Sequence, residues 1–368
     1  MKYKLKDIFD LQMGKTPSRN NSEYWNSEDY KWISIADLSK TGKYISDTKE
    51  YLSESAVEES GIKVIPANTV VMSFKLSIGK TAITAENMYS NEAIMAFHDK
   101  HVVDVLPEYI FYMFKYRNWD EGSNKAVMGK TLNKATLSEV EIEICPIEEQ
   151  REIVNILDKM MFILNGRENE LSLLDNLIKA RFVEMFGHPD LNEKGWKMNT
   201  FGDICTVRQG LQIPISKRLT EYGEDCYEYI TVQYLHGGKE REYIKSPKPT
   251  VICTKDDILM TRTGNTGMVI TNVDGVFHNN FFLIDFDREK YDKDFLVQYL
   301  NLDLIQADIL RRAGTSTIPD LNHGEFYKIR VFEPPFDLQR QFNDFKRQVD
   351  KSKFMKIDYM NKTRRFPL

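Results

Sequence analysis

The sequence predicts an α+β protein made of two tandem-repeat domains, each a mixed β-sheet with short helices. Two long antiparallel coiled-coil helices are expected to separate the domains around a pseudo-two-fold axis. Three observations lead to this prediction: the second half repeats the first, each half begins with short β-type segments, and each half ends in a proline before a long helical pattern. The expected boundaries are 1–145 for the first domain, 146–188 for a central spacer helix, 196–334 for the second domain and 335–368 for a distal spacer helix.

The repeat consists of five blocks that occur in the same order in both halves, with offsets that drift by only a few residues. They pair Leu5–Gly14 with Phe201–Gly210, Tyr30–Leu38 with Tyr227–Leu235, Val70–Ile83 with Ile258–Ile270, Asn91 with Asn279, and Leu132–Ile153 with Leu321–Phe342. Any single block could arise by chance, whereas five in one order indicate a duplicated unit.

Short runs rich in Val, Ile, Thr and aromatic residues, bounded by Gly, Asn and Pro, predict the strands of each half. These runs are Trp32–Ile35, Thr69–Phe74, Tyr229–Val232 and Ile258–Arg262. A short amphipathic helix is expected after them, over Leu106–Arg117 in the first half and Asp292–Arg312 in the second.

The two long helical patterns predict the spacer. From Ile147 to Phe186, apolar residues alternate at three- and four-residue spacing, as in a coiled-coil seam. They are Val154, Leu157, Met161, Leu164, Leu171, Ile178, Phe182 and Met185. A continuous helix of this length would span roughly 60 Å, although Asn165-Gly166 could kink it. In the second helix Phe342, Phe345, Val349 and Met360 are the expected packing residues.

Composition narrows the class of protein. The formal net charge of −5 is unlike that of a typical nucleic-acid-binding domain, but a basic face and an acidic helix can share one chain. We expect no membrane span, because no apolar run is long enough. The four scattered cysteines form no zinc pattern and favour a reduced, cytoplasmic compartment.

One short motif invites a catalytic interpretation. Glu333–Phe336 reads EPPF, one residue away from the Asp/Asn-Pro-Pro-Tyr/Phe loop of DNA amino-methyltransferases. The first half has ICPI at the equivalent place, so only Pro146 is shared, and no glycine-rich loop for S-adenosylmethionine occurs upstream. Proline at a helix start needs no other explanation, because backbone N–H groups in the first turn have no acceptor within the helix and proline therefore loses no hydrogen bond there. We therefore interpret this motif as the hinge between a domain and its helix.

Other catalytic patterns are equally weak. Pro319-Asp320 with Asp344 and Lys346 loosely fits a metal-dependent nuclease, but Asp344 and Lys346 fall in the predicted spacer helix. The three Gly-Lys-Thr triplets lack the earlier glycine of a phosphate-binding loop. The turn at Gly264–Gly267 is better explained by a tight hairpin. We expect no catalytic residue and no metal site, and the chain resembles a binding protein more than an enzyme.

The loops around the shared landmarks carry side chains suited to DNA. Arg, Lys, Asn and Gln contact phosphates and base edges, and glycine lets the backbone approach closely. The candidate DNA-binding residues are Lys15, Thr16, Arg19, Asn20, Lys75, Lys80, Asn91, Lys130, Arg208, Gln209, Gln212, Lys217, Arg218, Arg262, Asn265, Asn279, Arg311 and Arg312.

An ordinary polar surface remains the alternative for each of these residues, and Arg311-Arg312 could simply complement a helix C-terminus before Gly314. Corresponding loops are basic and polar in both halves while their sequences differ. A shared fold with different loop sequences indicates that the two halves recognise two different DNA sequences.

The duplicated plan resembles the DNA-specificity subunit of type I restriction–modification systems. The resemblance covers nearly the whole chain and rests on Leu5–Pro17 (LKDIFDLQMGKTP), Asn91–Ile94 (NEAI), Cys145–Asp158 (CPIEEQREIVNILD), and Arg181–Pro189 (RFVEMFGHP) ahead of Gly195–Lys197. The second helix departs from the pattern, because it ends soon after Phe366 without repeating RFVEMFGHP.

The resemblance implies a non-catalytic subunit with two target-recognition domains, each reading half of a bipartite, asymmetric site in double-stranded DNA. The implied partners are two methyltransferase (modification) subunits and restriction/translocase subunits. S-adenosylmethionine and ATP with Mg²⁺ are expected in those partners and no cofactor in this chain. The alternatives are a self-sufficient DNA methyltransferase or nuclease with its own recognition domains, and a coiled-coil scaffold that binds only protein.

Overall fold

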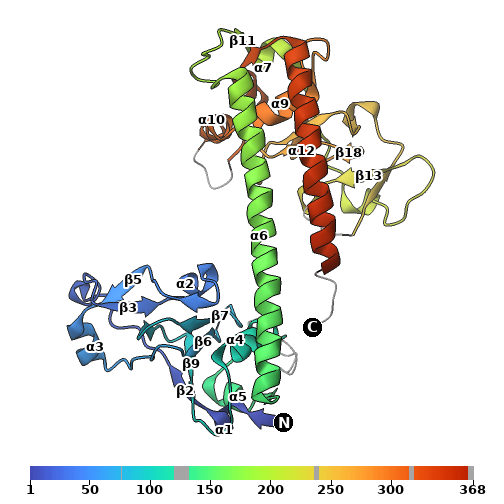
Figure 1. The fold of residues 1–368 in the computed structure, drawn as a ribbon. Coiled ribbons are helices and arrows are strands. Elements are labelled where there is room, and N and C mark those ends of the chain that lie inside the picture. Colours follow the sequence, from blue (N-terminus) through green and yellow to red (C-terminus); the bar gives the residue numbers. More distant parts are fainter. Residues whose placement is uncertain (76, 120–131, 236–239, 315–318, 364–368) are drawn as a thin grey trace. The chain divides into compact units, whose positions relative to one another are not determined.

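The computed structural model describes residues 1–75, 77–119, 132–235, 240–314 and 319–363, with the backbone alone for 354–363. Its contacts divide the chain into two units, Met1–Asn165 and Gly166–Leu368. The longest helix, α6 (Ile147–Phe186), runs through the boundary between the units without interruption. Both units contain β-sheets and short helices (Figure 1).

The first unit is built on a five-stranded main sheet with the strand order β2-β9-β6-β7-β4. A three-stranded sheet, β5-β3-β8, and a two-stranded pair, β1-β10, complete its β-structure. Helix α4 (Pro107–Tyr116) packs against β6 and β7. The remaining bounds are β1 Lys2–Lys4, α1 Leu5–Ile8, β2 Phe9–Met13, η1 Ser22–Tyr24, β3 Tyr30–Ile33, α2 Ile35–Lys40, β4 Tyr44–Ile45, β5 Glu50–Leu52, α3 Glu54–Ser60, β6 Val70–Ser73, β7 Thr81–Thr84, β8 Tyr89–Ser90, β9 Ile94–Asp99, α5 Lys134–Ser138 and β10 Glu141–Glu143.

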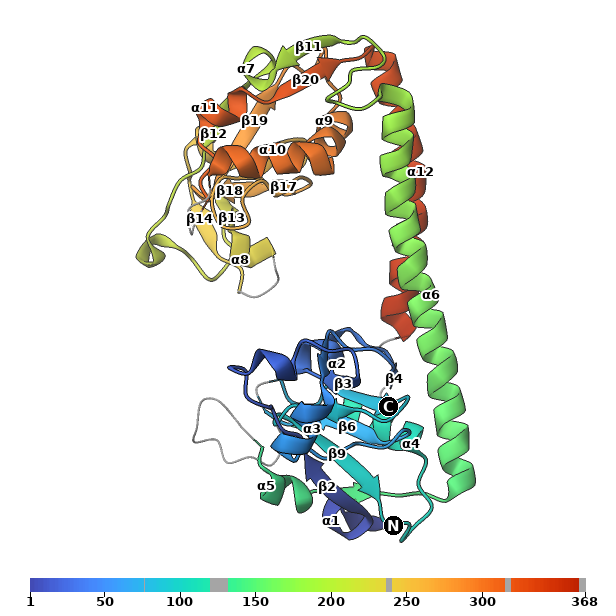
Figure 2. The ribbon, with the colours of Figure 1, turned by 90° about the vertical axis from the view of Figure 1, so that its left-hand side faces the viewer.

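The second unit has a main sheet with the order β12-β19-β16-β17, a second sheet with the order β14-β13-β18-β15, and the pair β11-β20. Figure 2 shows α9 and α10 beside the strands of this unit. The bounds are β11 Lys197–Thr200, α7 Phe201–Ile204, β12 Cys205–Gln209, η2 Ile215–Lys217, β13 Cys226–Ile230, α8 Val232–Leu235, β14 Tyr243–Lys245, η3 Pro249–Val251, β15 Ile252–Cys253, β16 Ile258–Thr261, β17 Val269–Ile270, β18 Gly275–Phe277, β19 Phe281–Phe286, α9 Lys293–Leu300, α10 Asp303–Ala313, α11 His323–Tyr327, β20 Arg330–Glu333 and α12 Phe336–Thr363.

The two units share one topology, which confirms the repeat predicted from the sequence. β2-β9-β6-β7 corresponds to β12-β19-β16-β17, and all neighbours in both sets are antiparallel. The parallel pair β3·β8 corresponds to β13·β18. The strands expected around Trp32, Val70, Tyr229 and Ile258 are all present, with boundaries shifted by a few residues.

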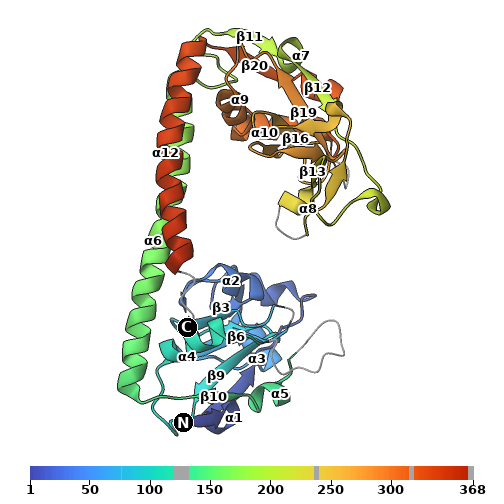
Figure 3. The same ribbon diagram turned by 90° about the vertical axis from the view of Figure 1, so that its right-hand side faces the viewer.

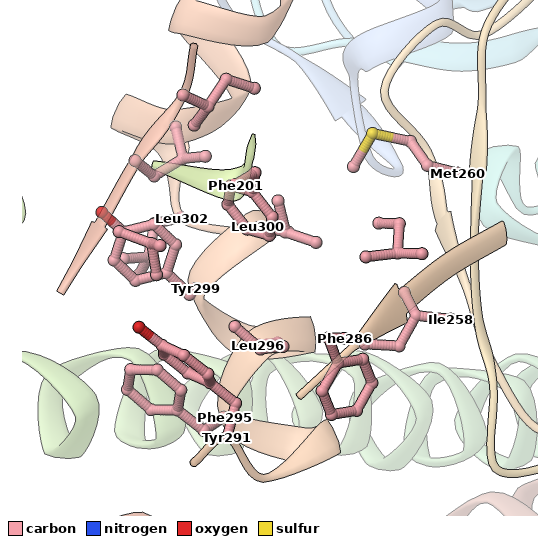
Figure 4. Close-up of a cluster of buried hydrophobic side chains, with 14 of the residues drawn as sticks. Phe201, Ile258, Met260, Phe286, Tyr291, Phe295, Leu296, Tyr299, Leu300 and Leu302 are labelled. Carbon is pink, nitrogen blue, oxygen red and sulfur yellow. The ribbon is translucent and has the colours of Figure 1, made fainter. Parts of the chain in front are cut away.

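Buried apolar residues from the main sheet, the short helices and α6 form a core in each unit. In the first unit Phe9, Met72, Phe97 and Phe114 lie in this core, and Leu157 of α6 packs with them. The second core is more aromatic, and Figure 4 shows Phe295 and Tyr299 of α9 in it. Both rings contact Phe182 of α6. Apolar residues near the beginning of α6 therefore pack in the core of the first unit, and those near its end pack in the core of the second unit.

Helices α6 and α12 pack in antiparallel directions within the second unit, as the sequence predicts (Figure 3). Phe342 near the start of α12 contacts Phe182 near the end of α6, with ring centroids 5.2 Å apart. Further along α12, Lys353 Nζ lies 2.5 Å from the carboxylate of Asp175, which is earlier in α6. The predicted packing residue Val349 is buried, whereas the side chain of Met360 lies outside the described residues.

One local expectation needs correction. The segment Asp292–Arg312 forms two helices, α9 and α10, because the chain breaks at Asn301, whose side chain bonds back to the carbonyl of Val297. Gln306 Nε2 then donates to the carbonyl of Leu300 and satisfies the end of α9. Helix α6 does not break at Asn165-Gly166, since it is helical throughout, and the kink considered there stays a prediction.

The EPPF motif is a strand-to-helix hinge. Glu333 is the last residue of β20, and α12 begins at Phe336 directly after the two prolines. The carboxylate of Glu333 accepts hydrogen bonds from Asn199 Nδ2 at 2.7 Å and Lys197 Nζ at 3.1 Å, on the neighbouring strand β11. These side-chain bonds hold the carboxylate in a structural role at the end of its strand.

Candidate nucleic-acid interface

In the first unit, the candidate loops meet at one edge of the main sheet. Strand pairing places Met13 at the end of β2 opposite Met95 at the start of β9, and Met95 opposite Met72 near the end of β6. Met72 in turn faces Thr81 at the start of β7. The segments that leave these strands, residues 14–21, 74–75, 77–80 and 91–93, therefore share one edge, which we call the loop edge of the unit.

The second unit has the equivalent loop edge. Gln209 at the end of β12 lies opposite Phe282 of β19, which lies opposite Met260 of β16. Its segments are residues 210–212, 262–268 and 278–280, and the turn at 264–267 forms the hairpin between β16 and β17 that the sequence predicts. Because the strand orders match, the two loop edges occupy the same place in their units.

A glycine fixes a close approach of two segments in each loop edge. Gly14 N–H donates to the carbonyl of Ile94, and Gly210 N–H donates to that of Phe281, both at 3.1 Å. A Cβ atom on Gly14 would lie 2.2 Å from the carbonyl oxygen of Asn91, and one on Gly210 would lie 2.2 Å from that of His278. Only glycine permits this contact, so the sequence match of these two glycines has a steric cause.

Apart from Arg19 and Asn20, five candidate residues lie on the loop edge of the first unit, and local contacts hold four of them. The Lys15 ammonium donates to the carbonyl of Ser60, Thr16 donates to the carboxylate of Glu92, and Lys80 donates to the hydroxyl of Ser39. Asn91 Oδ1 caps its own turn by accepting the Ala93 N–H at 3.0 Å. The fifth residue is Lys75, whose ammonium lies 5.4 Å from the ring centroid of Phe74.

Arg19 and Asn20 lie further along the same loop, toward the three-stranded sheet. The Arg19 guanidinium pairs with Glu50 of β5 and lies over the ring of Trp25, 3.7 Å from its centroid. Hydrogen bonding to Glu50 raises the pKa of Arg19 above its ordinary value. Asn20 is exposed. Lys130 lies outside the described residues.

In the second unit, Gln209 and Asn279 meet at the loop edge. Gln209 Nε2 donates to the carbonyl of Asn279 at 2.5 Å, and Gln209 Oε1 lies 2.8 Å from His323 Nε2. Since Oε1 can only accept, the histidine carries its proton on Nε2. Burial lowers the pKa of His323, which favours this neutral form. The Oδ1 atom of Asn279 is buried without a hydrogen-bond partner among the described residues.

Arg262 and a turn asparagine extend this edge, whereas Arg208 does not. Arg262 follows β16 and pairs with the carboxylate of Asp320 through two nitrogens. Asn265 adopts a positive φ of 54° in the β16–β17 hairpin and is exposed. Arg208 points elsewhere: its Nη1 donates to the carbonyl of Thr250 at 3.2 Å.

Arg311 and Arg312 form the last turn of α10, as the helix-end alternative predicts. Both pair with Asp308, and Arg312 also lies 3.4 Å from Glu325. The end of α10 is tied to the loop edge through Asp320, whose N–H donates to the carbonyl of Ala313.

The segment that follows Gly210 carries the remaining candidates away from the other segments of the loop edge. Arg218 is mostly buried: it donates twice to the carbonyl of Ile213 and pairs with Glu242 at 3.0 Å. Its guanidinium lies over the ring of Tyr229. Arg218 thus stabilises this segment, whereas Gln212 and Lys217 are exposed.

The candidate cations fall into two electrostatic classes. Arg19, Arg218, Arg262, Arg311 and Arg312 are paired with carboxylates. Within the described residues, Lys15, Lys75, Lys80, Arg208 and Lys217 form no ion pair, so their charge is not neutralised by a direct partner. The second class is better suited to phosphate contacts, because a phosphate need not displace a carboxylate.

The sequence did not identify His323 and Asp320 as residues of the second loop edge. His323 begins α11 and Asp320 precedes it, so both reach the edge only through the tertiary fold. The shared Leu-Asn at Leu321-Asn322 was the available signal, since it marks the return of the chain to the sheet in both halves.

In the part of the chain that the structure describes, no group of three or more His, Cys, Asp or Glu side chains is arranged to hold a metal ion. The residues of the nuclease-like pattern have other partners, since Asp320 binds Arg262 and Lys346 binds Asp294. Among the described helices, none combines the length and the apolar character needed to cross a membrane.

Comparison with known proteins identifies one family. The sequence pattern described as "Type I restriction modification DNA specificity domain" matches residues 1–173 and again residues 193–357. The two matches coincide closely with the two halves of the repeat.

Several curated relatives carry related names. A type I restriction enzyme specificity subunit of Methanocaldococcus jannaschii (MjaIX) is 29% identical over 230 residues, which are 57% of this chain and 52% of the relative. A specificity subunit of Escherichia coli (EcoR124I/EcoR124II) is 30% identical over 42% of this chain and 39% of its own length. Another from Escherichia coli (EcoprrI) is 22% identical over 91% of this chain and 84% of its own length. The matched regions thus span about half or less of the first two relatives.

Two solved structures share the fold. The S subunit of a type I restriction–modification system from M. genitalium superposes with a TM-score of 0.55 at 16% identity, covering 98% of this chain and 92% of that one. A chain from work on complex assembly and conformational transition of the type I R-M system gives a TM-score of 0.59 at 16% identity, covering 99% and 94%. At this identity the likeness concerns the fold alone.

Proposed function

The chain belongs to the type I restriction modification DNA specificity family, because the two matched segments cover most of its length, and we propose that it is the DNA-recognition subunit of such a system. Each unit reads one half of a bipartite, asymmetric site in double-stranded DNA. The domains that do so are residues 1–145 and 196–334, and the spacer helices are residues 146–188 and 335–368.

The observation that carries this proposal is the pair of loop edges. Both are built on the same strand order and the same close glycine contact, at Gly14 and Gly210. Their side chains differ: the first offers Lys15, Lys75 and Lys80, whereas the second offers an arginine paired with a carboxylate and a Gln–His pair. One frame with two sets of side chains is what two different half-sites require.

The long helices supply the distance between the half-sites. The beginning of α6 packs in the core of the first unit and its end packs in the core of the second, so one continuous helix contributes to both cores. A continuous helix of 40 residues rises about 60 Å. We propose that this helix fixes the gap between the half-sites, and that α12 supports it.

The chemistry belongs to partner subunits in this proposal. Two modification subunits transfer the methyl group from S-adenosylmethionine, and restriction/translocase subunits use ATP and Mg²⁺ to move along DNA and cut it. This chain has no catalytic step and holds no cofactor; it selects the sequence and positions the partners. The EPPF motif supports this division, because Glu333 is bound by Asn199 and Lys197 at a structural hinge.

Reconstitution tests the proposal. The purified chain is incubated with S-adenosylmethionine and DNA, alone and with its modification partner. We expect no methyl transfer by the chain alone and sequence-selective transfer by the complex. Methyl transfer or cleavage by the isolated chain would show that it is a self-sufficient enzyme and would refute the proposal.

A further inference from the structure

Arg262 holds a fixed position at the loop edge of the second unit. Its N–H donates to the carbonyl of Asn280 at 2.6 Å, and its own carbonyl accepts the N–H of Leu321 at 3.1 Å. The next residue, Thr263, forms a β-bridge with Asp320. The backbone of Arg262 is therefore tied to the segments on both of its sides.

The side chain of Arg262 is ordered as well. Nε donates to Asp320 Oδ1 at 2.5 Å and Nη2 donates to Oδ2 at 2.7 Å, so two parallel hydrogen bonds fix the plane of the guanidinium. Both side chains stay accessible, with exposed fractions of 35% for Arg262 and 43% for Asp320. Hydrogen bonding to Arg262 holds the pKa of Asp320 below its ordinary value, so the pair is charged at neutral pH.

This pairing uses one edge of the guanidinium and leaves the other available. A guanidinium has five N–H groups, and Asp320 takes the Nε–H and one Nη2–H. Among the described residues, nothing accepts a hydrogen bond from Nη1 or from the second Nη2–H. One Nη1–H and the second Nη2–H lie in the plane of the guanidinium and point in parallel directions, which matches the O6 and N7 acceptors of guanine in the major groove.

The first unit offers a contrast at the same place. Phe74 follows β6 as Arg262 follows β16, and its N–H donates to the carbonyl of Ala93 as that of Arg262 donates to Asn280. Phe74, however, is 1% exposed and belongs to the core. The equivalent backbone position is thus used for packing in one unit and presents an ordered cation in the other.

We propose that Arg262 is a specificity-determining residue that reads one guanine in the half-site of the second unit, and that Asp320 is the positioning residue that holds it. The inference rests on the proposed function and names one base that the second unit recognises. Asp320 contributes in two ways. It restrains a flexible side chain before DNA binds, which lowers the entropy lost on binding. It also offsets the positive charge, which makes Arg262 a poorer phosphate ligand than an unpaired lysine.

The test uses the complex of the full chain with its modification partner and a DNA library in which each base pair of both half-sites is varied. The variants are Arg262→Lys, which keeps the charge but loses the planar fork, and Asp320→Asn, which keeps the shape but loses the paired carboxylate. Arg288→Lys is the matched control. Arg288 pairs with Asp257 at 2.9 Å at the opposite end of β16, and its guanidinium also donates to the carbonyl of Asp256.

For Arg262→Lys we expect discrimination at a single G·C position of one half-site to fall by about tenfold to a hundredfold, with the other half-site unchanged. Asp320→Asn should relax the same position by a smaller factor, and Arg288→Lys should leave every position unchanged. Restored discrimination in Asp320→Glu would support a positioning role, because this variant keeps the carboxylate.

Two results would overturn the inference. The variant could instead bind all DNA sequences more weakly by the same factor, with the slope of log affinity against log salt concentration reduced by about one. That result would identify Arg262 as a phosphate contact. An unchanged base profile in variants that remain folded by circular dichroism would identify a purely structural ion pair. The wild-type complex in the same experiment reports on the proposed function, so failure of that proposal can be told apart from failure of this one.

Discussion

Gln150 and Gln339 are equivalent residues that make the same three hydrogen bonds, each in its own unit. Gln150 is fully buried in the first turn of α6. Its Oε1 accepts the N–H of Leu106 at 2.9 Å, and its Nε2 donates to the carbonyls of Asp104 and Cys145 at 2.9 and 2.8 Å. One side chain thus ties the start of the spacer helix to the loop before α4 and to the segment after β10.

Gln339 repeats this arrangement in α12. It is also fully buried; its Oε1 accepts the N–H of Asp292, and its Nε2 donates to the carbonyls of Lys290 and Pro334, all at 2.9 Å. Pro334 is part of the motif that resembles a catalytic loop, and its carbonyl is used to position a helix. The shared glutamine therefore explains why the hinge is kept in both halves.

The first prediction concerns these glutamines. Replacement of Gln339 by alanine leaves three backbone groups without partners in a dry environment, so we expect the free energy of unfolding to fall by roughly 2–5 kcal/mol. Gln150→Ala should have a similar effect in the first unit. Urea denaturation of each variant measures the change. Gln348→Ala, at an exposed position of the same helix α12, is the control, and an equal loss in that variant would count against the hinge interpretation.

A second prediction concerns the close contact at the loop edges. Gly14→Ala and Gly210→Ala place a Cβ atom 2.2 Å from a backbone carbonyl oxygen, so the crossing segments must separate. We expect each variant to lose roughly 1–3 kcal/mol of stability and the complex to lose selective methylation. Thermal unfolding and a methylation assay measure the two effects. At Gly42 a Cβ would meet nothing within 4 Å, so Gly42→Ala should leave both properties unchanged. Normal recognition by Gly14→Ala would show that the contact is dispensable.

Most of the fold could be predicted from the sequence because the second half of the chain repeats the first. Residues such as Gly14 and Gly210 recur at the same place for a steric reason, and the proline–glutamine pair marks the start of each helix. The break between α9 and α10 could not be predicted, because the residues on both sides of Asn301 continue a helical pattern. Only the side-chain bond of Asn301 to Val297 and that of Gln306 to Leu300 show why the helix ends there.

The candidate interface was less predictable. Residue type predicted which loops could bind DNA, and the strand order places those loops at one edge of each main sheet. The sequence could not show which cations are neutralised, because the partners of Arg218 and Arg262 come from distant parts of the chain. Arg218 was an expected DNA contact, but its mostly buried position beside Glu242 gives it a structural role in this fold. Its role in DNA binding stays a prediction that only a variant can test.

A third prediction concerns the acid stability of the first unit. Asp158 of α6 accepts hydrogen bonds from Lys43 Nζ at 2.7 Å and from Tyr112 Oη at 2.5 Å. Burial raises the pKa of Asp158, but these hydrogen bonds outweigh it and hold the pKa below its ordinary value. A carboxyl group with a depressed folded-state pKa stabilises the fold above its unfolded-state pKa of about 3.9, and that contribution is lost as the pH falls through the folded-state value.

We therefore expect Asp158→Asn to be less stable than the wild type at pH 7, with the difference shrinking as the pH falls below about 4. Chemical denaturation at a series of pH values measures this. Asp29→Asn removes an exposed carboxylate from the same unit. Its free energy of unfolding should vary with pH in the same way as that of the wild type. A constant difference between Asp158→Asn and the wild type at all pH values would contradict the assignment.

A fourth prediction concerns the spacer. Insertion of seven residues at Asn165–Glu170 adds two helical turns and about 10 Å with little rotation, and the site precedes the contact between Asp175 and Lys353. We expect the preferred gap between half-sites to lengthen by about three base pairs while the half-sites stay the same. Insertion of two residues rotates the helix by about 200° and should abolish methylation instead. An unchanged gap in the seven-residue variant would contradict the role of α6 as a ruler.

The central claim is that two domains of one chain read two different half-sites. Sequencing the methylated bases of DNA from cells that carry this chain and its modification partner tests it most directly. The account predicts a split motif, with two unrelated specific sequences separated by a gap of fixed length and no sequence preference. A single uninterrupted motif, or two identical half-sites, would contradict it.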